Sequence, residues 1–196
     1  PDADVKMTVM GAVFGAVGTA GQRCTSTRRL IIHEDIYNEV RDAIVNAYKQ
    51  IKIGNPLDQS NHVGPVIDKL AVDMYSKALD KVVEEGGNII VEGGILEGEG
   101  YESGCYVKPA IAEAKPDFHI VQEETFAPIL YVMTYKTLGE AILMHNDVPQ
   151  GLSSAMFTQS VKNSELFLVF FNLELINSIA SIEPIGAIIL RNTFIF

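Results

Sequence analysis

Hydrophobic and polar positions alternate along this chain in blocks whose periods predict helices and strands in turn. Residues 5–20 are apolar almost throughout, which predicts a helix that is buried on all sides. Residues 36–51 place apolar side chains three and four positions apart, which predicts an amphipathic helix with one buried face. A third helix is predicted over residues 68–85, where Gly86 and Gly87 end it.

Strands are predicted between and after these helices. Runs rich in β-branched and aromatic residues occupy positions 29–33, 88–91, 106–112, 128–135 and 152–158, and a short helix is predicted over 138–144. Strands that alternate with helices predict an α/β fold with a mainly parallel sheet and flanking helices. Because open parallel sheets bind ligands beyond the carboxyl ends of their strands, we expect the functional site there.

The composition excludes several classes of function. A net charge of −10 over 196 residues argues against nucleic-acid binding, which needs clustered Lys and Arg to neutralise phosphates. No apolar stretch reaches the about 18–20 uninterrupted residues of a membrane span, so we expect no membrane partner. Two cysteines and four scattered histidines give no spacing typical of a metal site. Few cysteines also favour an intracellular location, cytoplasmic or mitochondrial.

The stretch from residue 21 to 29, Gly-Gln-Arg-Cys-Thr-Ser-Thr-Arg-Arg, offers the clearest candidate chemistry. Cys24 lies in a predicted turn between an apolar helix and a strand, and Arg23, Arg28 and Arg29 bring positive charge that favours the reactive thiolate. On these residues alone, a buried and inert thiol is the commoner state of a free cysteine. A hydrolase that pairs Cys24 with His33 is disfavoured, because nine residues of extended chain separate them by roughly 30 Å.

This stretch resembles the nucleophile loop of the aldehyde dehydrogenase superfamily. Further matching segments follow in order at residues 54–56, 64–65, 123–129 and 151–158. Within the superfamily, the Arg-Cys-Thr run and Ala127 are most similar to the antiquitin subfamily, the α-aminoadipic semialdehyde dehydrogenases. We therefore expect a partial catalytic domain over residues 1–158. Residues 159–196 are a divergent apolar tail in which no motif of the superfamily is recognisable.

The resemblance implies a role for individual residues. Cys24 would be the nucleophile that attacks a small aldehyde, and its backbone N–H would donate to the oxyanion. Arg23 and Thr25 would bind the substrate, although Arg23 could equally serve only to tune the thiolate. Glu124 and Phe126 match the motif that contacts NAD in this superfamily. Without the resemblance, Glu124 would be interpreted as a solvated carboxylate and Phe126 as a core aromatic residue.

We accordingly predict a fragment or isoform of an NAD-dependent aldehyde dehydrogenase, which oxidises a semialdehyde to its carboxylate through a cysteine thioester. By resemblance, the general base, the second oxyanion donor and the dinucleotide-binding domain would lie before residue 1, so we expect little activity from this chain alone. The alternative is a catalytically incompetent isoform that only associates with intact subunits. Full-length members of the superfamily are expected to be homo-oligomers.

Overall fold

The computed structural model describes residues 2–149, 152–169 and 193–195. Its strands form one six-stranded sheet in the order β2-β3-β4-β1-β6-β5, in which β2 runs antiparallel to β3 and the other described pairs are parallel. The mainly parallel sheet is as predicted. The strands are β1 (Arg29–His33), β2 (Asn88–Val91), β3 (Ala110–Glu113), β4 (Ile129–Tyr135), β5 (Ser154–Met156) and β6 (Thr193–Ile195).

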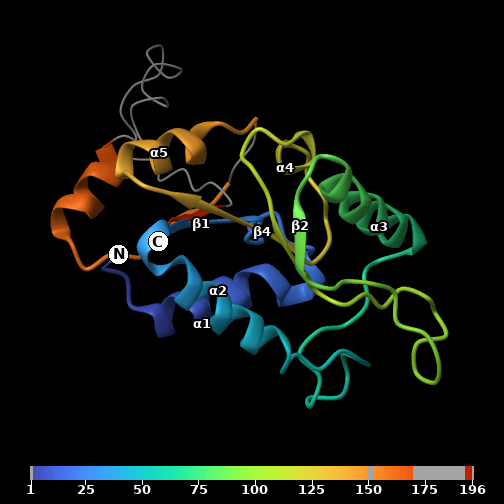
Figure 1. The fold of residues 1–196 in the computed structure, drawn as a ribbon. Coiled ribbons are helices and arrows are strands. Elements are labelled where there is room, and N and C mark those ends of the chain that lie inside the picture. Colours follow the sequence, from blue (N-terminus) through green and yellow to red (C-terminus); the bar gives the residue numbers. More distant parts are fainter. Residues whose placement is uncertain (1, 150–151, 170–192, 196) are drawn as a thin grey trace, which may run out of the picture.

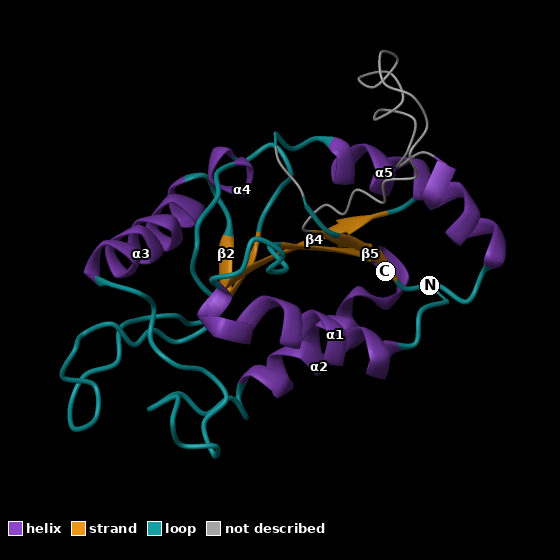
Figure 2. Cartoon of the chain, turned by 180° about the vertical axis from the view of Figure 1, so that it is seen from behind, coloured by secondary structure: helices purple, strands orange, loops and turns teal. Residues whose placement is uncertain are grey.

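Helices cover both faces of this sheet, which confirms the α/β class. Helices α1 and α2 lie on one face, and α3, α4 and α5 lie toward the other (Figures 1 and 2). Short 3-10 turns follow α1 and precede α2, and residues 161–169 are also helical. The bounds are α1 (Val5–Val17), α2 (Tyr37–Tyr48), α3 (Lys69–Glu84), α4 (His119–Gln122) and α5 (Leu138–Asn146).

Strands β1 and β4 form the centre of the core. Leu30, Ile31 and Ile32 of β1 are fully buried, as expected for a parallel strand covered on both faces. The parallel register pairs Arg29 with Tyr131. This register brings the segments that precede the two strands to the same edge of the sheet.

Helix α1 differs from its prediction. Its small residues, among them Ala12 and Ala16, are buried, but Met7, Met10 and Phe14 are 60–67% exposed. The expectation of a helix buried on all sides was therefore wrong. Small side chains allow the inner face of α1 to pack closely on α2 and β4, and in the described structure nothing comparable covers its outer face.

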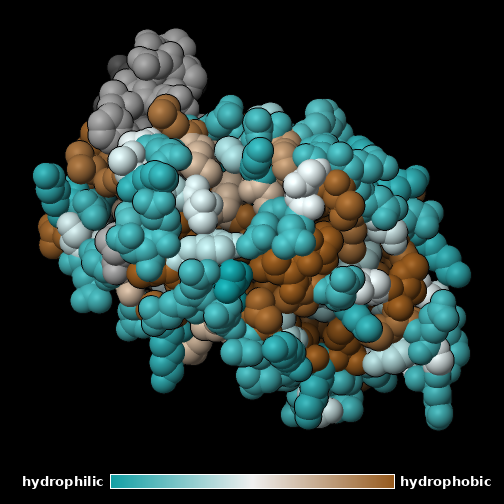
Figure 3. Space-filling view, in the orientation of Figure 1, coloured by the Kyte–Doolittle hydropathy of each residue, from teal (hydrophilic) through white to brown (hydrophobic). Residues whose placement is uncertain are grey.

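The edge of the sheet formed by β2 is also partly open. Ile89, Ile90 and Val91 are half-buried, and hydrophobic residues gather around β2 and the inner side of α3 in Figure 3. The neighbouring strand β3 begins at Ala110 and not at Tyr106 as predicted, because Pro109 has no N–H for a ladder bond.

The predicted tail, residues 159–196, is described in part. Residues 161–169 are helical, and β6 enters the sheet between β1 and β5. Residues 170–192 lie outside the described structure, so the division of the chain after residue 158 stays a prediction. Among the described residues, no helix is both long enough and apolar enough to cross a membrane.

Candidate active site

Cys24 lies at the tip of a tight turn. The backbone N–H of Ser26 donates to the carbonyl oxygen of Arg23 over 3.0 Å, and the N–H of Arg23 donates to Ser26 Oγ over 3.1 Å. Cys24 and Thr25 therefore occupy the two central positions of the turn, and both are exposed. The thiol is accessible to a substrate, which argues against the buried, inert state.

The backbone that leads into this turn is strained. Thr19, Ala20 and Gly21 have φ angles of 55°, 53° and 68°, in a left-handed region that costs side-chain-bearing residues about 1–2 kcal/mol each. Gly21 is also in direct contact with Ala127, because a Cβ built on it would lie 2.5 Å from the carbonyl carbon and oxygen of Ala127. Only glycine fits this position. Such strain is typical of functional sites.

Glu124 and Phe126 lie on the loop between α4 and β4, next to Ala127, which contacts Gly21. Both are exposed, Phe126 by 38%, whereas Thr125 between them is buried. The ring of Phe126 is therefore open on the surface and is not a core aromatic. A carboxylate can accept hydrogen bonds from ribose hydroxyls, and an accessible aromatic ring can pack on a flat heteroaromatic ring, so these residues fit part of an NAD site.

Arg28 joins the two segments. Its guanidinium donates to the carbonyl oxygen of Ala127 over 2.6 Å and to that of Gly21 over 2.5 Å, and it lies 5.4 Å from the ring centroid of Phe126. Burial lowers the pKa of Arg28 to about 10, and the nearby carboxylate of Glu124 opposes this shift. The cation therefore persists at neutral pH.

Two further segments of the predicted motif set meet the nucleophile turn. Gln22 Oε1 accepts from the N–H of Ile67 over 2.8 Å, and its Nε2 donates to the carbonyl oxygen of Pro65 over 3.4 Å. Ser153 Oγ donates to the carbonyl oxygen of Thr25 over 3.5 Å. Segments that are separated by up to 128 residues in the sequence thus converge on one turn.

The arginines are arranged differently from the sequence prediction. Arg29 is 3% exposed and donates to the carbonyl oxygens of Met144 and His145 over 2.7 and 2.9 Å. Arg23 donates to Thr19 Oγ1 over 2.9 Å and lies 5.0 Å from the ring centroid of Phe14. Hydrogen bonds thus hold each guanidinium, that of Arg28 included, against a group other than the thiol, which the sequence did not predict. The positive charge expected around the sulfur stays a prediction.

The location of the site also corrects a prediction. The turn that carries Cys24 precedes β1, the segment of Glu124 and Phe126 precedes β4, and Ser153 precedes β5. All of these segments lie at the amino ends of parallel strands, so the expectation of a site at the carboxyl ends was wrong. The rule about carboxyl ends concerns loops that follow strands, whereas here the preceding loops carry the motifs.

The other candidate chemistries receive no support from the described residues. Each histidine contacts a residue other than Cys24: His33 packs on Tyr135, His62 accepts from Lys52, His119 pairs with Glu123, and His145 bonds to Ser154. No group of three His, Cys, Asp or Glu side chains in the described part of the chain could hold a metal ion.

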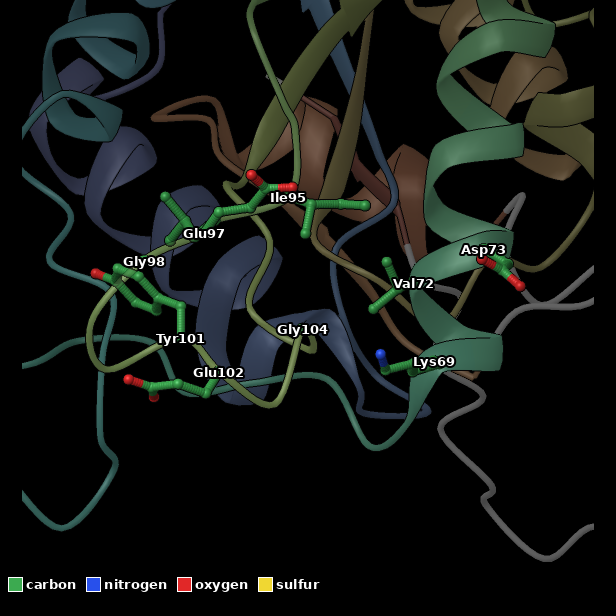
Figure 4. A pocket seen from close by; sticks show the side chains of 10 residues that line it. Lys69, Val72, Asp73, Ile95, Glu97, Gly98, Tyr101, Glu102 and Gly104 are labelled. Carbon is green, nitrogen blue, oxygen red and sulfur yellow. The ribbon is translucent and has the colours of Figure 1, made fainter.

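A separate hollow of about 410 Å³ lies between α3 and the loop of residues 93–104 (Figure 4). Lys69 and Asp73 contribute from α3, and Glu97 and Glu102 from the loop. The N–H of Gly100 bonds to Glu102 and lowers the pKa of its carboxyl. None of the residues predicted for catalysis or binding lines this hollow.

Comparisons with known proteins agree with this geometry. The model of the aldehyde dehydrogenase family matches residues 1–170. Aldehyde dehydrogenase family 7 member A1 of Pisum sativum is 47% identical over 166 residues, which cover 85% of this chain and 32% of that protein. The α-aminoadipic semialdehyde dehydrogenase of Rattus norvegicus is 45% identical over 161 residues, covering 82% and 29%.

Solved structures give the same result for the fold. The betaine aldehyde dehydrogenase of Staphylococcus aureus, solved in complex with NAD+, matches with a TM-score of 0.83 and 29% identity. The match covers 86% of this chain and 34% of that one. The chain thus spans about a third of the length of the proteins it matches.

Proposed function

Because the chain belongs to the aldehyde dehydrogenase family, we propose that it forms the nucleophile-bearing part of an NAD-dependent oxidoreductase that converts an aldehyde to a carboxylate. One observation carries this proposal. The exposed thiol of Cys24 lies on a turn whose base, at Gly21, packs directly against the segment of Glu124 and Phe126. A nucleophile and a cofactor-contact segment are thereby held together.

The proposed chemistry begins at the Cys24 sulfur. The thiolate adds to the aldehyde carbon, and the backbone N–H of Cys24 donates to the oxyanion that develops on the former carbonyl oxygen. Bound NAD would accept the hydride from this carbon, which leaves a thioester on Cys24. Water then attacks the thioester carbon, the C–S bond breaks with its electron pair remaining on the Cys24 thiolate, and the carboxylate product forms as the two protons of the water pass to solvent.

Glu124 and Phe126 would hold part of the cofactor. The exposed carboxylate can accept hydrogen bonds from ribose hydroxyls, and the open face of Phe126 can pack against the nicotinamide. The opposite charge of Arg28 lies close to both residues. The complex of the Staphylococcus aureus relative with NAD+ supports NAD as the cofactor.

We propose a semialdehyde that also bears a carboxylate as the substrate class. The similarity to α-aminoadipic semialdehyde dehydrogenases supports it, and Arg23 and Thr25 flank the nucleophile. A guanidinium can hold a carboxylate with two parallel hydrogen bonds. Arg23 would exchange its bond to Thr19 for this contact, and both side chains are at the surface. The proposed setting is a homo-oligomer inside the cell, in the cytoplasm or mitochondria.

A specific observation also favours the alternative, association with intact subunits without activity. Met7, Met10 and Phe14 present a row of exposed apolar side chains on α1, and the groove beside them is lined by Phe157. Exposed apolar patches of this kind mark interaction surfaces. Co-purification with a full-length family member that is lost in Met10→Lys would support association.

The enzyme proposal is tested by NADH formation from α-aminoadipic semialdehyde and NAD. We expect at most slow NADH formation from this chain alone, which falls to the background in Cys24→Ala and persists in Cys105→Ala, because Cys105 is the second cysteine and lies outside the site. Circular dichroism shows whether each variant is folded. Folded protein without activity would contradict the proposal for this chain and would leave association as its function.

A further inference from the structure

The hydrogen bonds of Arg28 satisfy two backbone carbonyl groups but leave one N–H of its own side chain without a partner among the described residues. Its two Nη atoms meet two carbonyl oxygens, one from each side of the Gly21–Ala127 contact. Its Nε is buried and has no hydrogen-bond partner among the described residues. A buried and unpaired N–H is unfavourable, so this geometry gives up one donor in order to bridge the two carbonyl groups.

The neighbouring Arg29 provides a comparison within the same chain. It also bridges two carbonyl oxygens, but both belong to consecutive residues at the end of α5, Met144 and His145. A positive charge that binds the last carbonyl groups of a helix stabilises the carboxyl end of that helix. The two acceptors of Arg28, in contrast, come from segments that are 106 positions apart in the sequence (127 minus 21), and both segments carry proposed functional residues.

Phe126 extends this bridge to the surface. Its exposed ring packs on the guanidinium of Arg28 at 5.4 Å, a contact that attracts a cation to the face of the ring. A change at the ring therefore alters the position and freedom of the guanidinium. The guanidinium in turn holds the carbonyl oxygen of Gly21, three residues before Cys24.

We propose that Arg28 is a positioning residue that couples Phe126 to the nucleophile turn, so that occupancy or loss of the Phe126 ring contact changes the reactivity of Cys24. The inference rests on the proposed function, since it assigns the coupling to a cofactor-contact residue and a nucleophile. The consequence is that the thiol reaches its reactive geometry in step with the cofactor segment. Arg28 itself does not touch the reacting atoms.

The test measures the rate at which iodoacetamide alkylates Cys24, resolved from Cys105 by peptide mass spectrometry, without cofactor. We expect Phe126→Ala and Arg28→Met each to change the Cys24 rate by at least about threefold, a modest coupling for residues in contact. The double variant should show no larger change than one of the single variants. Arg28→Lys should recover part of the effect, because an ammonium keeps the charge but cannot bridge both carbonyl groups.

A matched control is Tyr37→Ala, which removes another ring that packs on a guanidinium, that of Arg41 at 5.6 Å, on α2 and not on the nucleophile turn. It should leave the Cys24 rate unchanged. An unchanged Cys24 rate in Phe126→Ala, or effects that simply multiply in the double variant, would overturn the proposal. A parallel rise at Cys105 would indicate a general loosening of the fold and would also count against it.

Two features keep the test decisive. Phe126 is at the surface, so Phe126→Leu offers a milder variant if Arg28→Met does not fold. No cofactor or aldehyde is needed, so the coupling is measured independently of the enzyme proposal. Coupling without NADH formation would overturn only the proposed function, and NADH formation without coupling would overturn only the role of Arg28.

Discussion

The amino ends and the carboxyl ends of the parallel strands, here called the amino edge and the carboxyl edge of the sheet, differ in whether their contacts meet at predicted site residues. At the amino edge, Gly21 packs on the backbone of Ala127 and Arg28 bridges both, so segments about a hundred positions apart depend on one another. At the carboxyl edge, the contacts include local ones. Thr137 caps α5 through the N–H of Glu140, three residues away.

This difference indicates which edge of the sheet can hold a functional site. At the carboxyl edge, Lys136 pairs with Glu34 and His33 packs on Tyr135 across β1 and β4, but no predicted site residue takes part in these contacts, and the loss of the Thr137 cap affects α5 alone. The amino edge instead brings three other segments onto the turn of Cys24, and a disturbance in one of them reaches the others. The strained residues Thr19 and Ala20 also lie at the amino edge.

High pH should affect both edges together and have the largest effect. Burial raises the pKa of five tyrosines, and that of Tyr75 and Tyr135 reaches about 12. Because the unfolded chain releases these protons from about pH 10, stability is intact below pH 10. It should fall between about pH 10 and 12, by up to about 1.4 kcal/mol per pH unit for each tyrosine. The five are Tyr37, Tyr48, Tyr75, Tyr131 and Tyr135.

Urea denaturation at a series of pH values, followed together with phenolate absorbance, measures this loss. The absorbance should rise in step with unfolding. Phenolate formation by these five tyrosines near pH 10 in a chain that stays folded would contradict the expectation.

Gly21→Ala should disrupt the amino edge most strongly. The new methyl group would combine a φ of 68° with a distance of 2.5 Å to the backbone of Ala127, which costs at least about 3 kcal/mol. Gly86→Ala is the matched control, because Gly86 has a φ of 89° but open space around it, so about 1 kcal/mol is expected. Equal free energies of unfolding for the two variants would show that the Gly21–Ala127 contact does not matter.

Thr137→Ala should weaken the carboxyl edge alone. The loss of the cap costs about 1 kcal/mol, which chemical denaturation can measure, while the alkylation rate of Cys24 should stay unchanged. Thr137→Ser keeps the capping oxygen and should retain stability. A changed Cys24 rate in the alanine variant would mean that the two edges are not independent.

Thr19→Gly should have the smallest effect on stability. Relief of the left-handed strain is offset by the greater freedom of glycine in the unfolded chain and by the lost bond to Arg23, so the net change should stay within about 0.5 kcal/mol. The freed Arg23 should alter the apparent affinity for the carboxylate-bearing semialdehyde. Thr19→Ser retains the hydroxyl and should leave that affinity unchanged, and a large loss of stability in the glycine variant would contradict the strain argument.

Sequence patterns located several elements well. The bounds of β1 and β2 match their predictions, and α3 (Lys69–Glu84) lies within one residue of the predicted 68–85 at each end. The patterns failed where one element meets another. The outer face of α1 is exposed although its residues are apolar, and β3 begins late because Pro109 cannot donate a ladder bond. The partners of Arg28 and Arg29 were missed as well.

The sequence by itself determined the elements and the family. Periodicity, caps and glycine stops act over a few residues, and the order of short motifs persists whatever the chain packs against. The tertiary structure alone decided that Arg29 of β1 stands beside Tyr131 of β4. This register carries Gly21, Arg28 and Ala127 to one edge, and so places the open ring of Phe126 within reach of the turn of Cys24. Such contacts join residues about a hundred positions apart, so their energies leave no trace in the local pattern.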